Sequence, residues 1–240
     1  MSDPVAKQGQ FAALNQTKDS GPKVPVMWVV LGVVAVVALA AAVAIGITSG
    51  GDDGTVETST GEIVDAIEAA PVDIDGPSLP EFTDPTDDPA IGQPAPELTG
   101  VSYTGEEASI LFDGRPKVVV FLAHWCPVCQ AELPEIVEWL EADGLRDDVD
   151  LYAVATALDR PRGNLPSEWF VDEGYEGPVL LDSEDSEAAQ AFGLNAFPYW
   201  VVLDADGTVA LRFSGLPSDV LDRPAADAFS FLADFAAAGE

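Results

Sequence analysis

The sequence is poor in cysteine, histidine and basic residues, and each shortage narrows what the chain can do. Its 240 residues include 2 cysteines and 1 histidine, and 10 Lys and Arg stand against 42 Asp and Glu, for a formal net charge of -32. Most nucleic-acid roles are excluded, because phosphate binding needs clustered Lys and Arg. Two cysteines are also too few for a disulfide-stapled scaffold. We interpret the many acids as a solvated surface.

One long apolar run lies near the N-terminus. Residues 26–47 read VMWVVLGVVAVVALAAAVAIGI, which is 22 residues without a charge, enough to cross the roughly 30 Å hydrocarbon core as a helix. A cleaved signal peptide is the alternative, but its apolar region is only about 7–15 residues long. Lys7, Lys18 and Lys23 precede the run, and the next basic residue is Arg115. This asymmetry predicts a single-pass protein of the cell membrane, with its N-terminus in the cytoplasm and the rest outside.

Changes in composition divide the chain into four segments. We expect a cytoplasmic tail at 1–25, a transmembrane signal-anchor helix at 26–48, a disordered acidic linker at 49–90 and a globular domain at 91–240. The linker is rich in Gly, Pro, Thr and acids, and such a segment buries too little apolar area to order itself. Within it, residues 62–70 are predicted to form a short helix.

From residue 91 onward, strand patterns alternate with helix patterns. The continuous apolar run at 117–125 indicates a central strand covered on both faces. The helix after it repeats apolar residues at helical spacing, at Leu133, Ile136, Val137 and Leu140. Further strands are expected at 149–158 and 177–182, helices at 164–174, 183–193 and 222–238, and a hairpin at 199–215 around Asp206-Gly207. This order predicts an α/β domain built on one mixed sheet.

Both cysteines stand where the central strand gives way to the helix, in FLAHWCPVCQAELP. Pro127 suits the first helical position because no N–H is needed there. Cys126 therefore falls at the N-cap, where the positive end of the helix dipole favours thiolate over thiol. A reactive outer thiolate with a partner one turn inward is what thiol–disulfide exchange needs. A purely structural bridge between Cys126 and Cys129 would close too short a loop to contribute much stability.

These residues resemble a known family. Trp-Cys-x-x-Cys after an apolar strand resembles the thioredoxin superfamily. The longer string W-C-x-x-C-x-x-E-x-P and the preamble GQPAPELTGV resemble its membrane-tethered TlpA/DsbE-like branch, over about residues 90–238. The resemblance implies a thioredoxin fold, with helices flanking a mixed central sheet, in the domain at 91–240. It also implies a thiol-disulfide oxidoreductase with Cys126 as the nucleophile and Cys129 as the resolving cysteine. No cofactor is implied beyond this redox-active pair.

The resemblance also points to a client-binding surface. In this family a cis-proline opens the strand that faces the two cysteines, and Phe197-Pro198 stands at the head of a predicted strand. Cis bonds are mostly a property of X-Pro pairs, and proline is tolerated at the first residue of a strand. We therefore expect Phe197-Pro198 to be cis and to form, with Trp125, the surface that clients contact.

Two further residues are candidates for proton transfer or for tuning the thiols. Classical thioredoxins carry a buried aspartate where this chain has Val120, so proton transfer to Cys129 must use water or another group. Glu132 is one candidate, and the alternative is an exposed helix carboxylate. His124 can favour the thiolate when it is protonated, and the alternative is a solvent-facing residue at the rim of the site.

Other functions remain open beside redox exchange. Structural zinc needs four protein ligands, which two Cys and one His do not supply, so no metal site is expected. A copper-handling thiolate pair and a non-enzymatic redox sensor remain the alternatives. The expected partners are protein thiol or disulfide clients and a membrane electron-transfer partner, with no nucleic acid. Pro127 and Val128 add no polar group, and nearby acids oppose the thiolate, which favours reduction of clients over oxidation.

Overall fold

A computed structural model of the chain describes residues 55–57, 63–142 and 144–238. The expected cytoplasmic tail and transmembrane helix lie outside these residues. Among the helices of the described part, none combines the length and apolar character needed to span a bilayer.

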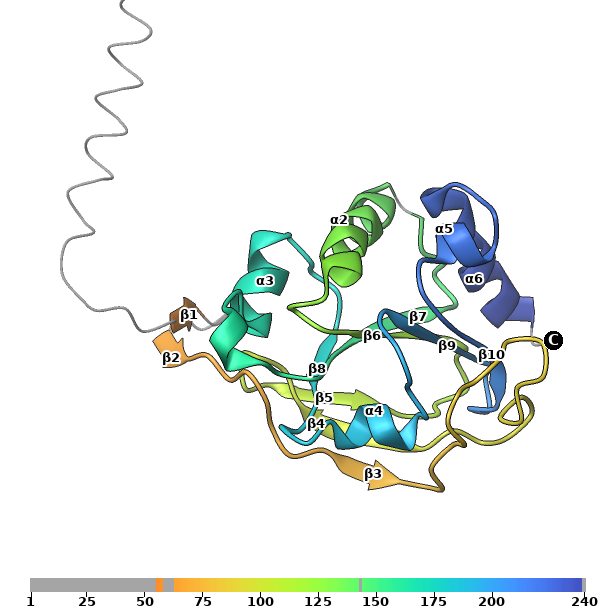
Figure 1. Cartoon of the computed structure of the whole chain (residues 1–240), viewed down its shortest axis with the longest axis horizontal. Helices are drawn as coiled ribbons and strands as arrows, with labels where there is room; N and C mark the ends of the chain where they lie inside the picture. The colour runs from red at the N-terminus through yellow and green to blue at the C-terminus, as the bar shows by residue number, and fades with distance from the viewer. Residues whose placement is uncertain (1–54, 58–62, 143, 239–240) are drawn as a thin grey trace, which may run out of the picture. The chain divides into compact units, whose positions relative to one another are not determined.

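The described residues contain three sheets, of five, three and two strands, and several helices (Figure 1). The strands are β1 (Thr55–Glu57), β2 (Ile63–Asp65), β3 (Asp73–Asp75), β4 (Glu97–Val101), β5 (Glu107–Ile110), β6 (Lys117–Leu122), β7 (Asp150–Ala155), β8 (Val179–Leu181), β9 (Tyr199–Leu203) and β10 (Val209–Ser214). The helices are α2 (Pro127–Glu141), the 3-10 turn η1 (Arg160–Arg162), α3 (Pro166–Asp172), α4 (Glu187–Ala191), α5 (Pro217–Val220) and α6 (Ala225–Ala238).

The larger sheet has the strand order β10-β9-β6-β7-β8. Strands β6, β7 and β8 run parallel, whereas β9 is antiparallel to β6, and β10 is antiparallel to β9. Every residue of β6 is buried, as expected for a continuous apolar strand between two covered faces. Figure 1 shows α2, α5 and α6 on one face of this sheet, with α4 and the strands β3-β4-β5 on the other. This is the mixed α/β arrangement of the thioredoxin fold that the sequence predicted.

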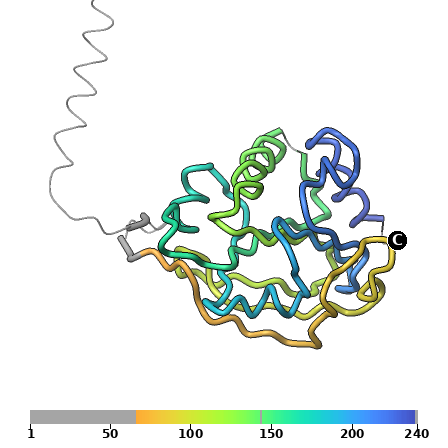
Figure 2. The backbone as a smooth tube through the Cα atoms, in the orientation of Figure 1, coloured from red at the N-terminus to blue at the C-terminus, as the bar shows by residue number. Residues whose placement is uncertain are grey.

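The segment before residue 91 is part of the domain, contrary to expectation. Strand β3 pairs with β4, and Leu79 and Phe82 are buried in the core. Figure 2 shows this segment in orange and yellow, running along the domain. The predicted linker at 49–90 is therefore wrong for residues 66–90, and the predicted helix at 62–70 is wrong because β2 is a strand. The acidic, proline-rich composition concealed the few apolar side chains that anchor the segment.

A buried ion pair also holds this segment in place. Arg212 on β10 is fully buried, and its Nε donates to Asp88 Oδ2 over 2.8 Å. Its Nη1 donates to the carbonyl oxygens of Pro80 and Phe192, both over 3.0 Å. Burial acts to raise the pKa of Asp88, but hydrogen bonds from Arg212 and from the Ala90 N–H, together with the Arg212 charge, outweigh it and lower that pKa. Asp88 is thus a carboxylate held by a charged partner.

Candidate active site

The two cysteines lie at the carboxyl end of the central strand. β6 ends at Leu122 and α2 begins at Pro127, with Cys126 as its N-cap in extended backbone geometry (φ -79°, ψ 119°). The Cys126 carbonyl accepts the N–H of Gln130 over 3.0 Å. The predicted N-cap position is confirmed, and it places Cys126 at the positive end of a 15-residue helix.

The two thiols differ in exposure and in environment. Both are free, with 7% of Cys126 exposed and none of Cys129. Burial raises the pKa of Cys129 far above its ordinary value, and the backbone of Ala123 opposes this only in part. Ionisation of Cys126 or of Glu132 raises it further. Cys129 is therefore a protonated thiol at neutral pH, and it needs a base before it can attack another sulfur.

Glu132 is buried beside the thiols. None of its surface is exposed, and in the described structure neither carboxyl oxygen has a hydrogen-bond partner. Burial raises its pKa to about 9. The indole N–H of Trp200 acts in the opposite direction but does not reach hydrogen-bonding geometry with either oxygen. The alternative of an exposed helix carboxylate is wrong, and with this pKa Glu132 is a neutral carboxylic acid at pH 7. Its role in proton transfer stays a prediction.

His124 is also buried, so its expected place at a solvent-facing rim is wrong. Only 1% of it is exposed. Its Nδ1 lies 3.0 Å from the carbonyl oxygens of both Gly163 and Asn164, and its Nε2 accepts the N–H of Asp159 over 3.0 Å. An imidazole that donates from one nitrogen and accepts at the other is neutral. His124 therefore ties the loop after β7 to the residues that precede Cys126.

An aromatic pair stands next to the thiols. The indole N–H of Trp125 donates to the Ala157 carbonyl over 2.7 Å, and its ring meets Phe197 edge-on, with centroids 5.9 Å apart. The Phe197–Pro198 bond is cis, as expected. Tyr199 pairs with Phe121 across the ladder, which places the residue before it at the same end of the sheet as Cys126. The role of this surface in binding clients stays a prediction.

Sequence reasoning missed two residues of this region. Trp200 follows the cis bond on β9, stands opposite Val120 in the ladder and approaches Glu132. Arg162 lies over the Trp125 ring, 4.7 Å from its centroid. No local sequence pattern marks either residue, because each meets the site only through contacts between distant segments.

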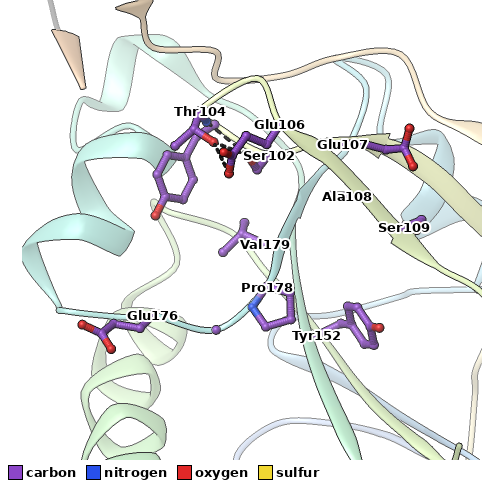
Figure 3. Close-up of a pocket in the computed structure, with 12 residues that line it drawn as sticks. Ser102, Thr104, Glu106, Glu107, Ala108, Ser109, Tyr152, Glu176, Pro178 and Val179 are labelled. Atoms are coloured by element: carbon purple, nitrogen blue, oxygen red, sulfur yellow. Dashed lines mark hydrogen bonds between the residues drawn. The ribbon is translucent and has the colours of Figure 1, made fainter. Parts of the chain in front are cut away.

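A separate pocket of about 590 Å³ lies away from the cysteines. Figure 3 shows the turn at Thr104, the side chain of Tyr152 from β7, and Pro178 and Val179 at the start of β8 around it. Neither thiol lines this pocket.

Comparisons with known proteins identify the family of the chain. A family model described as Redoxin matches residues 77–228. The thiol:disulfide interchange protein DsbE of Escherichia coli K12 is 26% identical over 141 residues, which cover 56% of this chain and 72% of that protein. The methylamine utilization protein MauD of Methylophilus methylotrophus is 24% identical over 127 residues, covering 52% of this chain and 56% of that protein.

Solved structures were compared in the same way. StoA from Bacillus subtilis superposes with a TM-score of 0.47 and 20% identity, over 60% of this chain and 98% of that one. The Redoxin match spans more than half of the sequence and includes both cysteines. The chain therefore belongs to the Redoxin family and is a thiol-disulfide oxidoreductase of the thioredoxin superfamily, similar to the DsbE/TlpA-like branch.

Proposed function

We propose that the protein is a membrane-tethered, extracytoplasmic oxidoreductase that reduces disulfides in envelope or secreted proteins. The observation that carries this proposal is the unpartnered, buried carboxyl of Glu132 one turn beyond the buried thiol of Cys129. The uncharged run at 26–47 and the lysines before it support the tether and its orientation.

The exchange proceeds in two steps. The Cys126 thiolate attacks a client disulfide, so that a Cys126–client bond forms and the second client sulfur leaves as a thiolate, which takes a proton from water. Cys129 then attacks the Cys126 sulfur, the Cys126–Cys129 bond forms, and the first client sulfur leaves as a thiolate. Two electrons pass from the pair to the client. A membrane dithiol donor restores the reduced pair by the same exchange in reverse.

Glu132 has the proton-transfer role in the second step. Cys129 must lose its proton before it attacks, and burial opposes the thiolate. A carboxylate at Glu132 accepts that proton, and because its pKa is about 9, the fraction able to act as a base rises with pH and reaches one half near that value. Val120, buried where thioredoxins have an aspartate, offers no such group.

The surroundings of the pair support the reducing direction. A strong oxidant stabilises its reduced form through the thiolate. Here burial opposes ionisation of Cys129, and both ring nitrogens of His124 are engaged by the backbone of the loop after β7. The start of α2 favours the Cys126 thiolate, and the neighbouring Pro127 and Val128 add no polar side chain. We therefore place the pair nearer to thioredoxin than to the strongest oxidants.

The reduction potential of the Cys126–Cys129 pair tests the direction. We expect a value nearer the roughly -270 mV of thioredoxin than the roughly -120 mV of the strongest oxidant, and a value close to the latter would contradict the reducing role. Protease added to intact cells tests the topology, because it should remove the domain beyond residue 50. A copper-handling role would instead appear as tight Cu(I) binding without turnover of disulfides.

A further inference from the structure

The residues that surround Cys126 on the surface are uncharged and mostly apolar. Pro127, Val128 and Gln130 are exposed, while Trp125 and Phe197 are partly buried. None of these five residues is acidic, in a chain whose net charge is -32. A client segment approaching Cys126 therefore meets apolar contacts at the centre, and any selection by charge depends on the residues at the rim.

Arg162 places a cation at that rim. Its guanidinium carbon is 4.7 Å from the centroid of the Trp125 ring, and its Nε donates to Asp159 Oδ2 over 2.7 Å. The side chain is 57% exposed. Within the described part of the chain, Nη1 and Nη2 make no hydrogen bond. These two nitrogens are parallel donors, the arrangement that a carboxylate accepts in a bidentate pair.

The loop that carries Arg162 is fixed to the residues just before the nucleophile. His124 makes three hydrogen bonds to its backbone, and Trp125 makes one to Ala157. The loop also holds two non-glycine residues in the left-handed region, Ala157 at φ 52° and Asn164 at φ 48°. Arg162 is therefore presented on an anchored loop, and this lowers the ordering cost when a partner binds it.

Arg160 lies in the same 3-10 turn but has a different environment. Its Nη2 pairs with Glu184 over 3.1 Å, and its side chain is 53% exposed. It resembles Arg162 in charge, in exposure and in place along the chain, yet among the described residues it does not stack on the Trp125 ring. Arg160 is therefore a matched control for substitutions of Arg162.

We propose that Arg162 is a specificity residue that binds a carboxylate side chain of the client. The preferred clients carry Asp or Glu within a few residues of the cysteine that Cys126 attacks. This inference rests on the proposed exchange at Cys126 and adds the class of client to it. Arg162 takes no part in the bonds that form and break.

Single-turnover reduction of three peptides tests the proposal. The peptides share one disulfide and differ only in Glu, Gln or Lys beside the attacked cysteine, and the full chain is reduced beforehand in detergent. We expect the Glu peptide to react about two- to fivefold faster than the Gln peptide at low salt, because exposed ion pairs are weak, and added salt should shrink this ratio. Arg162→Gln should bring the ratio to about one, and Arg162→Glu should favour the Lys peptide instead.

The controls separate specificity from structure. Arg160→Gln should keep the Glu preference, and Arg162→Lys should keep part of it. A role for Arg162 in loop structure alone would slow all three peptides by the same factor and leave the ratio unchanged, which would overturn the proposal, as would the absence of any preference in the unmodified protein. Failure of the proposed function differs from both, because the reduced protein would then reduce none of the peptides, nor hydroxyethyl disulfide.

Discussion

Two buried carboxyl groups of this domain, Asp88 and Glu132, have opposite surroundings. Asp88 anchors the segment before β4 and receives two hydrogen bonds from a buried arginine, so its pKa is lowered. Glu132 lies behind the thiols without a hydrogen-bond partner, and burial raises its pKa to about 9. Asp88 is charged and paired with Arg212. Glu132 is neutral because burial removes the water that would stabilise its carboxylate.

The difference separates a structural role from a chemical one. A buried charge is tolerated when it is paired, and breaking such a pair is costly because the partner is left uncompensated. A buried carboxyl without a partner lowers the stability of the fold. Residues with strongly shifted pKa values are concentrated at functional sites. We therefore expect changes near Asp88 to alter stability and changes near Glu132 to alter exchange.

The largest effect on exchange should come from the cysteines themselves. Cys126→Ser should lower the rate of disulfide reduction more than about a thousandfold, because the nucleophile is lost. Cys129→Ser should still attack clients but should accumulate mixed disulfides, visible on non-reducing gels. Cys126 should also be alkylated before Cys129, whose pKa is raised by burial. Equal trapping by the two variants would contradict the assigned roles.

Breaking the ion pair should give the largest effect on stability. Asp88→Asn leaves the Arg212 charge buried without its partner, and we expect a loss of about 3–5 kcal/mol in the free energy of unfolding, measured with urea. Asp87→Asn, at an exposed neighbouring position, is the control and should change little. Because the pKa of Asp88 is lowered, its contribution is present above the unfolded value near 3.8 and is lost as the pH falls below it. A loss for Asp88→Asn no larger than the control's would show that the pair is dispensable.

Glu132→Gln should separate stability from activity. The folded pKa of about 9 exceeds the ordinary 4.5, so the folded state binds more protons between these values, and Glu132 destabilises the fold increasingly as the pH rises through that window. The variant should therefore be more stable at pH 7, by on the order of 1–3 kcal/mol. Its resolution of mixed disulfides should be at least about tenfold slower, without the rise toward pH 9. Glu138→Gln, exposed on the same helix, is the control, and an unchanged pH profile in Glu132→Gln would remove Glu132 from proton transfer.

The sequence predicted most of what local patterns determine. The strand before Cys126, the N-cap position and the glycine that ends α4 at Gly193 (φ 71°) follow from short-range rules. The burial of Glu132 also had a signal, because it lies three residues beyond Cys129 and four before Ile136, on the same buried face of α2. That spacing outweighs the preference of glutamate for solvent.

Other features could not be predicted, because they depend on distant contacts. Arg212, the buried partner of Asp88, is 124 residues away in the sequence. The acidic, proline-rich residues around Asp88 therefore predicted a linker. His124 ends an apolar run, and its burial is explained only by a loop 35 to 40 residues downstream. The same holds for Trp200, because only the pairing of β9 with β6 brings it near Glu132 of α2. Local propensity carries no information on contacts between residues that are distant in the sequence. These residues come together only in the folded chain.

The smallest predicted effect refines the environment of Glu132. The indole N–H of Trp200 is the group that lowers the pKa of Glu132 against the effect of burial. Trp200→Phe keeps an aromatic ring but removes this N–H, so the pKa of Glu132 should rise further. The pH dependence of mixed-disulfide resolution should move upward by the same amount.

Trp169→Phe is the matched control for that change. Trp169 is equally buried, and its indole N–H also has no hydrogen-bond partner in the described structure, but it packs against Phe170 on α3 rather than beside the thiols. Both variants lose the same atoms from the core and should lose similar stability in urea. Only Trp200→Phe should shift the pH profile of resolution. If both variants shifted it equally, the effect would arise from general loosening of the core, and the indole of Trp200 would have no specific influence on the carboxyl that serves Cys129.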